Sequence, residues 1–214
     1  MMKRIGIEIN GVLRDTIGKF SQVYEKHMIE NDDEPSKTYE LDLSGNTQEN
    51  TIEDEFEYKM ISDVTSLDLI NHFSFKDNDE LYSFMYEDFV MQIFGHAGST
   101  ETFTFNELND FYINFRDEYE ILIVSDEMGR SKPASLFFLS KFGCLVENIK
   151  FYSNSTLQNL WDSLDILVSA NPKLIENAPK HKTIIKYVTQ YNENVDCEYK
   201  INELKTLNEI IKNL

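Results

Sequence analysis

Short runs of apolar residues occur once near the start of the chain and four times in its second half. The first spans residues 4–9, and the next is an uninterrupted run at 121–124. Three more follow at 149–152, 165–168 and 183–188. An uninterrupted run such as 121–124 is typical of a strand that is buried on both faces of a parallel sheet, and the other runs also favour strands. The pattern therefore predicts five strands.

Segments with helical periodicity separate these runs, and only 31–50 is polar enough to predict a loop. Strands that alternate with helices imply an α/β fold, here a Rossmann-like parallel five-stranded sheet with helices on both faces. The predicted helices begin near residues 16, 51, 79, 104, 131 and 202, and those at 51 and 79 extend to residues 61 and 94.

The first two predicted strands are more than 110 residues apart, and the charge of the chain is concentrated in this gap. The chain carries 38 acidic and 20 basic residues, a net charge of −18. From Glu30 to Glu120 there are 24 acids and four bases, a net of −20, whereas the rest of the chain has a net of +2. Charge and periodicity together predict an acidic, mainly helical insertion at 17–115, within a core formed by 1–16 and 116–214.

The charge and the absence of long apolar segments exclude several classes of partner. Nucleic acid and anionic membranes would be repelled, whereas a basic protein could bind the acidic insertion. No run of about 18 apolar residues predicts a membrane span, and the polar Glu8 comes too early for a signal-peptide apolar region. Two cysteines, Cys144 and Cys197, indicate reduced thiols rather than a disulfide framework. These features predict a cytoplasmic protein.

Candidate chemistry lies where the predicted strands end, because ligands of open parallel sheets bind at the carboxyl ends of the strands. The residues at these ends are small or polar, as a solvent-filled crevice requires. They are Glu8 and Asn10 after the first strand, Ser125 after the second, Asn154 and Ser155 after the third, and Ser169 and Ala170 after the fourth.

The order of these segments resembles the haloacid dehalogenase (HAD-like) superfamily of phosphatases, in particular its deoxyribonucleotidase-like branch. Residues 4–16 are similar to the family pattern of an apolar strand followed by Asp-x-Asp-Gly-Val-Leu and a nearby Asp. The strand ending in Ser125 and the segments 164–172 and 182–192 are similar to later parts of that pattern. The acidic insertion stands where the family inserts a helical cap. The resemblance implies a HAD-like core with a cap after the first strand.

The resemblance also implies a role for each position. In the family, one Asp attacks phosphorus, a second is the general acid/base, a Ser or Thr and a Lys bind the phosphoryl group, and paired acids hold Mg²⁺. These positions are occupied here by Glu8 (nucleophile), Asn10 (acid/base), Ser125 (phosphate-binding hydroxyl), Asn154 and Ser155 (in place of the lysine), and Ser169 and Ala170 (metal).

Most of these positions lack the chemistry of the family. The extra methylene of Glu8 displaces the carboxylate by about 1–1.5 Å, and in-line attack tolerates little displacement. Asn10 has no proton to transfer, and Ser169 and Ala170 offer no anionic ligand to Mg²⁺. We therefore predict vestigial catalytic positions at Glu8, Asn10 and Ser125, with no metal or cofactor. Weak phosphate binding is predicted at Ser125, Asn154 and Ser155.

Two functions follow from this pattern. The first is a non-catalytic binding, regulatory or assembly protein with a HAD-like fold. The alternative is a Mg²⁺-dependent phosphatase or 5′-nucleotidase with shifted chemistry, in which Glu8, Asp126 or Asp15 holds the metal.

Overall fold

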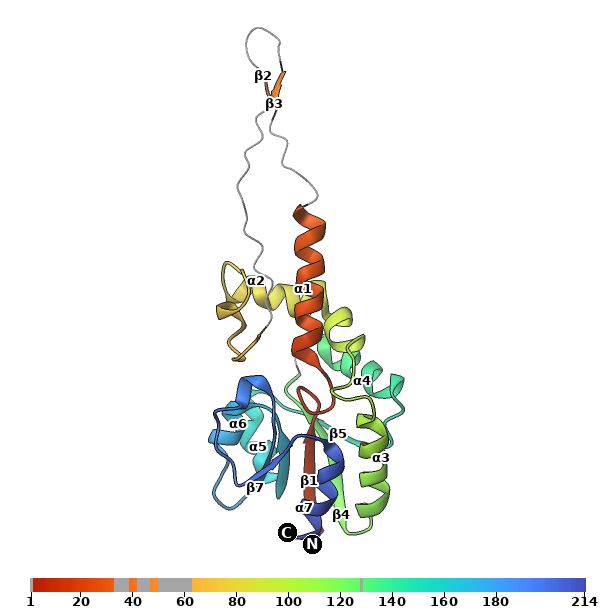
Figure 1. The fold of residues 1–214 in the computed structure, drawn as a ribbon. Helices are drawn as coiled ribbons and strands as arrows, with labels where there is room; N and C mark the ends of the chain where they lie inside the picture. Colours follow the sequence, from red (N-terminus) through yellow and green to blue (C-terminus); the bar gives the residue numbers. More distant parts are fainter. Residues whose placement is uncertain (1, 33–38, 42–46, 50–62, 128) are drawn as a thin grey trace.

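Six parallel strands form the central sheet in the computed structural model, which describes residues 2–32, 39–41, 47–49, 63–127 and 129–214. The strand order is β5-β4-β1-β6-β7-β8 (Figure 1). The strands are β1 (Lys3–Glu8), β4 (Tyr119–Ser125), β5 (Asn148–Phe151), β6 (Ile166–Ser169), β7 (Thr183–Tyr187) and β8 (Tyr199–Ile201).

The prediction of a parallel α/β sheet is confirmed, but the number of strands was wrong: there are six rather than five. The additional strand, β8, is only three residues long and pairs with β7 at the edge of the sheet. Of its residues only Ile201 is buried. A half-exposed edge strand needs no continuous apolar run, so the criterion that found the central strands did not detect it.

Helices cover both faces of the sheet. One face packs against α3 (Thr104–Phe115), α4 (Ser131–Lys141) and α7 (Leu207–Lys212), and a 3₁₀ turn precedes α7 (Figure 1). The opposite face packs against α5 (Leu157–Asp162) and α6 (Pro172–Glu176). The two layers bury alternate residues of the strands, and this accounts for the continuous apolar runs in the sequence.

The segment between β1 and α3 has a hydrophobic core of its own. It contains α1 (Thr16–Asp32), which points away from the sheet, and α2 (Asn78–Ser83); both lie at the end opposite the two chain termini (Figure 1). Its buried cluster is rich in aromatic rings, such as the edge-to-face pair of Phe20 and Phe73 at 4.6 Å. Ala134 of α4 also belongs to this cluster, so the insertion packs directly on the core.

The predicted helix over 79–94 is interrupted in the structure. After α2 the chain forms two π-helical turns, Phe84–Asp88 and Met91–Gly95. Hydrogen bonds five residues apart close them, from Phe89 N to Phe84 O at 3.0 Å and from His96 N to Met91 O at 2.8 Å. Helical spacing alone cannot distinguish this wider winding from an α-helix.

Two other predictions fall in the insertion. The predicted helix over 51–61 lies outside the described residues. Within the predicted loop at 31–50, β2 (Tyr39–Leu41) and β3 (Thr47–Glu49) pair as an antiparallel hairpin.

The last helix of the predicted insertion, α3, packs with the core sheet. The buried side chains of α3, among them Leu108 and Phe111, belong to the cluster that covers the sheet. They are separate from the aromatic cluster of the insertion. α3 therefore packs on the core sheet, although it lies within the predicted insertion at 17–115. In the described part of the chain, no helix is both long and apolar enough to cross a membrane.

Candidate functional site

The turn after β1 brings the first group of candidate residues to the carboxyl end of the sheet. Gly11 has a φ of +78°, which favours glycine. A Cβ atom there would lie 2.0 Å from the hydroxyl of Tyr191 and 2.8 Å from Cβ of Ala170. Glycine is therefore required both by the backbone angle and by the close approach of two neighbouring loops.

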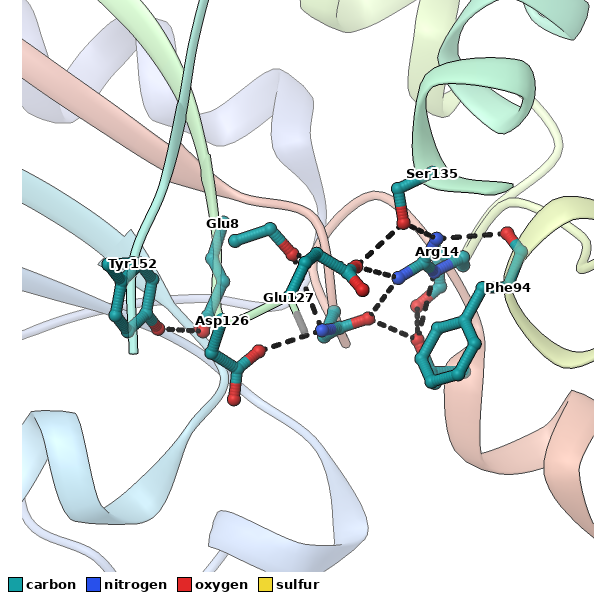
Figure 2. Close-up of polar contacts among 10 residues, drawn as sticks. Glu8, Arg14, Phe94, Asp126, Glu127, Ser135 and Tyr152 are labelled. Carbon is teal, nitrogen blue, oxygen red and sulfur yellow. Dashed lines mark hydrogen bonds and ion pairs between the residues drawn. The ribbon is translucent and has the colours of Figure 1, made fainter. Parts of the chain in front are cut away.

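Glu8 is the last residue of β1, and its carboxyl group is held within the core. Its side chain is 1% exposed. Tyr152, which follows β5, donates its hydroxyl to Oε1 at 2.8 Å (Figure 2). Ser169, at the end of β6, donates to Oε2. Both oxygens are thus hydrogen-bonded to residues from two other strands of the sheet, Tyr152 after β5 and Ser169 in β6.

This environment favours the neutral form of Glu8. Burial, followed by the nearby charge of Asp126, raises the pKa of Glu8 to about 8, although hydrogen bonds from Ser169 and Tyr152 partly oppose the shift. At neutral pH the carboxyl group is therefore mostly protonated.

Asn10 lies in the same turn and is fully hydrogen-bonded. Its Nδ2 donates to Asp126 Oδ1 at 2.9 Å and to Ser125 Oγ at 3.4 Å. Its Oδ1 accepts from Arg14 at 2.6 Å and from Thr16 at 2.8 Å. The amide therefore orders the turn instead of being available for proton transfer.

Arg14 is fully buried and connects the turn, the insertion and α4. Its guanidinium donates to the carbonyl of Phe94 in the insertion at 2.9 Å and to Ser135 of α4 at 2.5 Å (Figure 2). It also forms an ion pair with Glu127 at 2.6 Å. The guanidinium carbon lies 5.0 Å from the ring centre of Phe94, within cation–π range.

Glu127 completes this buried cluster. Its Oε1 accepts from Arg14, from Ser135 at 2.6 Å and from Ser125 at 3.0 Å. Its Oε2 is buried and has no hydrogen-bond partner among the residues that the structure describes. The hydroxyl of Ser125 therefore serves the ion pair and does not line the crevice.

A crevice of about 350 Å³ lies between the insertion and the carboxyl ends of β1 and β4. Apolar side chains of the insertion form one wall, among them Leu67, Leu81 and Met85. The core contributes the polar side. Its polar lining residues are Glu8, Asn10, Thr16, Asp126, Asn154, Asn171, Lys173 and Tyr191.

Asp126 lines this crevice with an exposed carboxylate. Oδ1 accepts from Asn10, whereas the other oxygen points away from the hydrogen-bonded network (Figure 2). The side chain is exposed within the crevice, yet the surrounding protein desolvates it. This desolvation, and then the charge of Glu127, raises the pKa of Asp126, whereas the hydrogen bond from Asn10 opposes the shift.

The predicted phosphate-binding residues do not come together. Ser125 is buried in the Arg14–Glu127 cluster, and Ser155 is exposed and bonds to Ser153. Of the three, only Asn154 lines the crevice. The lysine that does reach it is Lys173, from α6 rather than from the segment after β5.

Sequence reasoning missed Arg14, Tyr152 and Glu127. Two signals were present: Arg14 follows the apolar pair Val12-Leu13, and Glu127 lies two residues beyond a buried strand. A charged residue next to fully apolar segments is often buried with a partner of opposite charge. Tyr152 carried no comparable signal.

The whole chain aligns with solved structures at low sequence identity. The HAD-hydrolase YfnB from Bacillus subtilis, solved with bound magnesium, aligns with a TM-score of 0.59 and 10% identity over 99% of both chains. A haloacid dehalogenase-like family protein from Streptococcus pneumoniae gives 0.55 and 10%, over 100% of this chain and 99% of that chain. The chain has the fold of the HAD-like hydrolases.

An L-2-haloacid dehalogenase also matches the HAD-like fold of this chain over the full length of both proteins, with a TM-score of 0.52 and 11% identity. No family model matches the sequence, and neither does any curated protein. The comparisons therefore support the HAD-like fold that the resemblance implied.

Proposed function

We propose that this chain is a non-catalytic protein with a HAD-like fold, related to the deoxyribonucleotidase-like branch, that acts in binding, regulation or assembly. The observation that carries the proposal is the state of Glu8. Its two carboxyl oxygens are bonded to Tyr152 and Ser169, and its side chain is almost completely buried.

A nucleophilic carboxylate must be ionised and must present an oxygen about 3–3.5 Å from the atom it attacks. Glu8 meets neither condition at neutral pH, because burial raises its pKa to about 8 and both oxygens already accept hydrogen bonds. Asn10 cannot transfer a proton to a leaving group. These two positions favour binding over turnover.

The residues of the crevice fit Mg²⁺ poorly. Magnesium prefers several ionised carboxylates in a near-octahedral arrangement, whereas the carboxyl groups among the described lining residues are Glu8 and Asp126 alone, and Glu8 is mostly protonated at neutral pH. Ser169 and Ala170 stand where the family has paired acids. Among the described residues, no group of three or more histidine, cysteine or acidic side chains could hold a metal ion. We therefore derive no step through Mg²⁺.

The purified protein is expected to show no Mg²⁺-dependent hydrolysis of p-nitrophenyl phosphate or of nucleoside monophosphates. The measurement is phosphate release at pH 6 to 9 with and without Mg²⁺, compared with the Glu8→Gln variant as the matched background. Wild type and variant should be indistinguishable.

One result would support the alternative of a phosphatase or 5′-nucleotidase with shifted chemistry. It is turnover above the variant's background that requires Mg²⁺ and also disappears in Ser125→Ala. Loss in both variants would show that the reaction uses the positions proposed to be vestigial.

We also propose that a basic protein partner binds the acidic insertion, which carries nearly the whole net charge of the chain. The location we propose is cytoplasmic. In its favour, Cys144 and Cys197 are both free thiols.

A further inference from the structure

The crevice differs from an anion-binding site in the distribution of its charges. The carboxylate of Asp126 lines the crevice, and the oxygen that does not accept from Asn10 points away from the hydrogen-bonded network (Figure 2). Among the described lining residues the only base is Lys173, whose side chain is exposed to solvent. Asp126 is exposed as well, but it lies close enough to Tyr86, beside the apolar wall, to raise the pKa of that tyrosine, and this makes Asp126 the attachment point.

The charge of the molecule around Asp126 strengthens this preference. Glu127 lies next to it in the chain and acts on its titration, whereas the nearby Glu8 is mostly protonated at neutral pH. Arg14 offsets one of these charges by pairing with Glu127. The net charge of −18 also raises the local concentration of cations around the molecule.

The opposite wall of the crevice is apolar, and it determines the polarity of the part of the ligand that is not bound to Asp126. Leu67, Leu81 and Met85 present apolar surface, and the ring of Tyr86 stacks on Phe94 at 5.2 Å. Burial, followed by the charge of Asp126, raises the pKa of Tyr86, so its hydroxyl stays neutral. A neutral aromatic ring beside a carboxylate suits a cation with an apolar body.

We propose that this crevice binds a small organic monocation, with its ammonium group on Asp126 and its apolar part against the wall formed by Leu67, Leu81 and Met85. The volume of about 350 Å³ is at the lower end of the range for small-molecule sites. The proposal rests on the proposed function in one respect, since a crevice without turnover holds its ligand unchanged.

Three probes of nearly equal size and shape test the charge preference. Binding of benzylammonium, benzyl alcohol and benzoate to the full chain would be measured by calorimetry at pH 7 and moderate salt. Benzylammonium is expected to bind with one site per chain, at least about tenfold more tightly than the other two. Benzoate binding as tightly as benzylammonium would overturn the proposal, and so would no benzylammonium binding at about 10 mM.

Two variants locate the binding. Asp126→Asn should weaken benzylammonium binding at least about tenfold, whereas Asp88→Asn, which removes the same charge from an exposed position outside the crevice, should change it less than about twofold. Equal effects of both variants would mean non-specific attraction to an acidic protein and would overturn the site.

A second pair keeps the test valid if Asp126→Asn does not fold. Leu67 is partly exposed and lines the crevice, so Leu67→Lys places a cation there and Leu67→Gln is its neutral match. Leu67→Lys should abolish benzylammonium binding and Leu67→Gln should retain most of it; equal binding by both would contradict the site.

The proposed function and the proposed ligand are tested by different measurements. Phosphate release tests the proposed function and the titrations test the ligand, so failure of one is distinguishable from failure of the other.

Discussion

Replacing Arg14 with methionine is expected to lower the free energy of unfolding by about 3–5 kcal/mol, the range for breaking a buried ion pair from one side. The guanidinium is fully buried and pairs with Glu127, so its removal leaves an uncompensated carboxylate in the interior. It also removes the guanidinium donor from the carbonyl of Phe94 and one of the two donors to Oδ1 of Asn10. Urea unfolding at pH 7 measures the loss.

Two further variants separate the buried pair from charge in general. Arg4→Met removes an exposed partner of Glu120, and its cost should be about 0–1 kcal/mol. The double variant Arg14→Met/Glu127→Met replaces both buried charges with apolar groups and should recover at least half of the stability lost in the single variant. A single-variant loss below about 1 kcal/mol would show that the cluster does not stabilise the fold.

Raising the pH from about 4.5 to about 8 is expected to destabilise the protein through Glu8. The unfolded chain releases this proton near pH 4.5, whereas the folded protein retains it up to about pH 8. The contribution is fully present below the unfolded pKa, declines through this window and is lost above the folded pKa. The expected change is a few kcal/mol.

The Glu8→Gln variant isolates this effect, because it keeps a neutral, hydrogen-bonding side chain at all pH values. Its stability relative to wild type should rise by a few kcal/mol between pH 5 and pH 8.5 in parallel urea titrations. Glu176→Gln, which removes an exposed acid, serves as the control for overall charge repulsion. If all three proteins gave parallel curves, Glu8 would not be protonated in the folded state at neutral pH.

The sequence predicted the central sheet well because burial on both faces leaves an unambiguous pattern. The run that became β4 is apolar without interruption, and the strands beside β1 were identified in the same way. Elements at the periphery of the fold leave a weaker pattern of apolar residues in the sequence. β8 lies at an edge, and the π-helical turns Phe84–Asp88 and Met91–Gly95 depend on how aromatic rings pack rather than on periodicity.

The candidate site was only partly predictable, for a related reason. Chain order placed Glu8, Asn10 and Ser125 at the carboxyl edge of the sheet, which is where the structure has them. Their orientations depend on partners more than 100 residues away. Tyr152 binds Glu8 directly, and Asn10 is linked to Glu127 because Arg14 donates to both. No local pattern encodes contacts of that kind.

The central position of β1 has a consequence for how the chain folds during synthesis. Its neighbours are β4 and β6, so Ile5 pairs with Ile121 on one side and Ile166 on the other. Ribosomes add about 5–20 residues per second, which leaves this apolar strand without its sheet partners for many seconds. Such distant pairings also slow folding after release. The nascent chain should therefore depend on chaperones until β6 emerges.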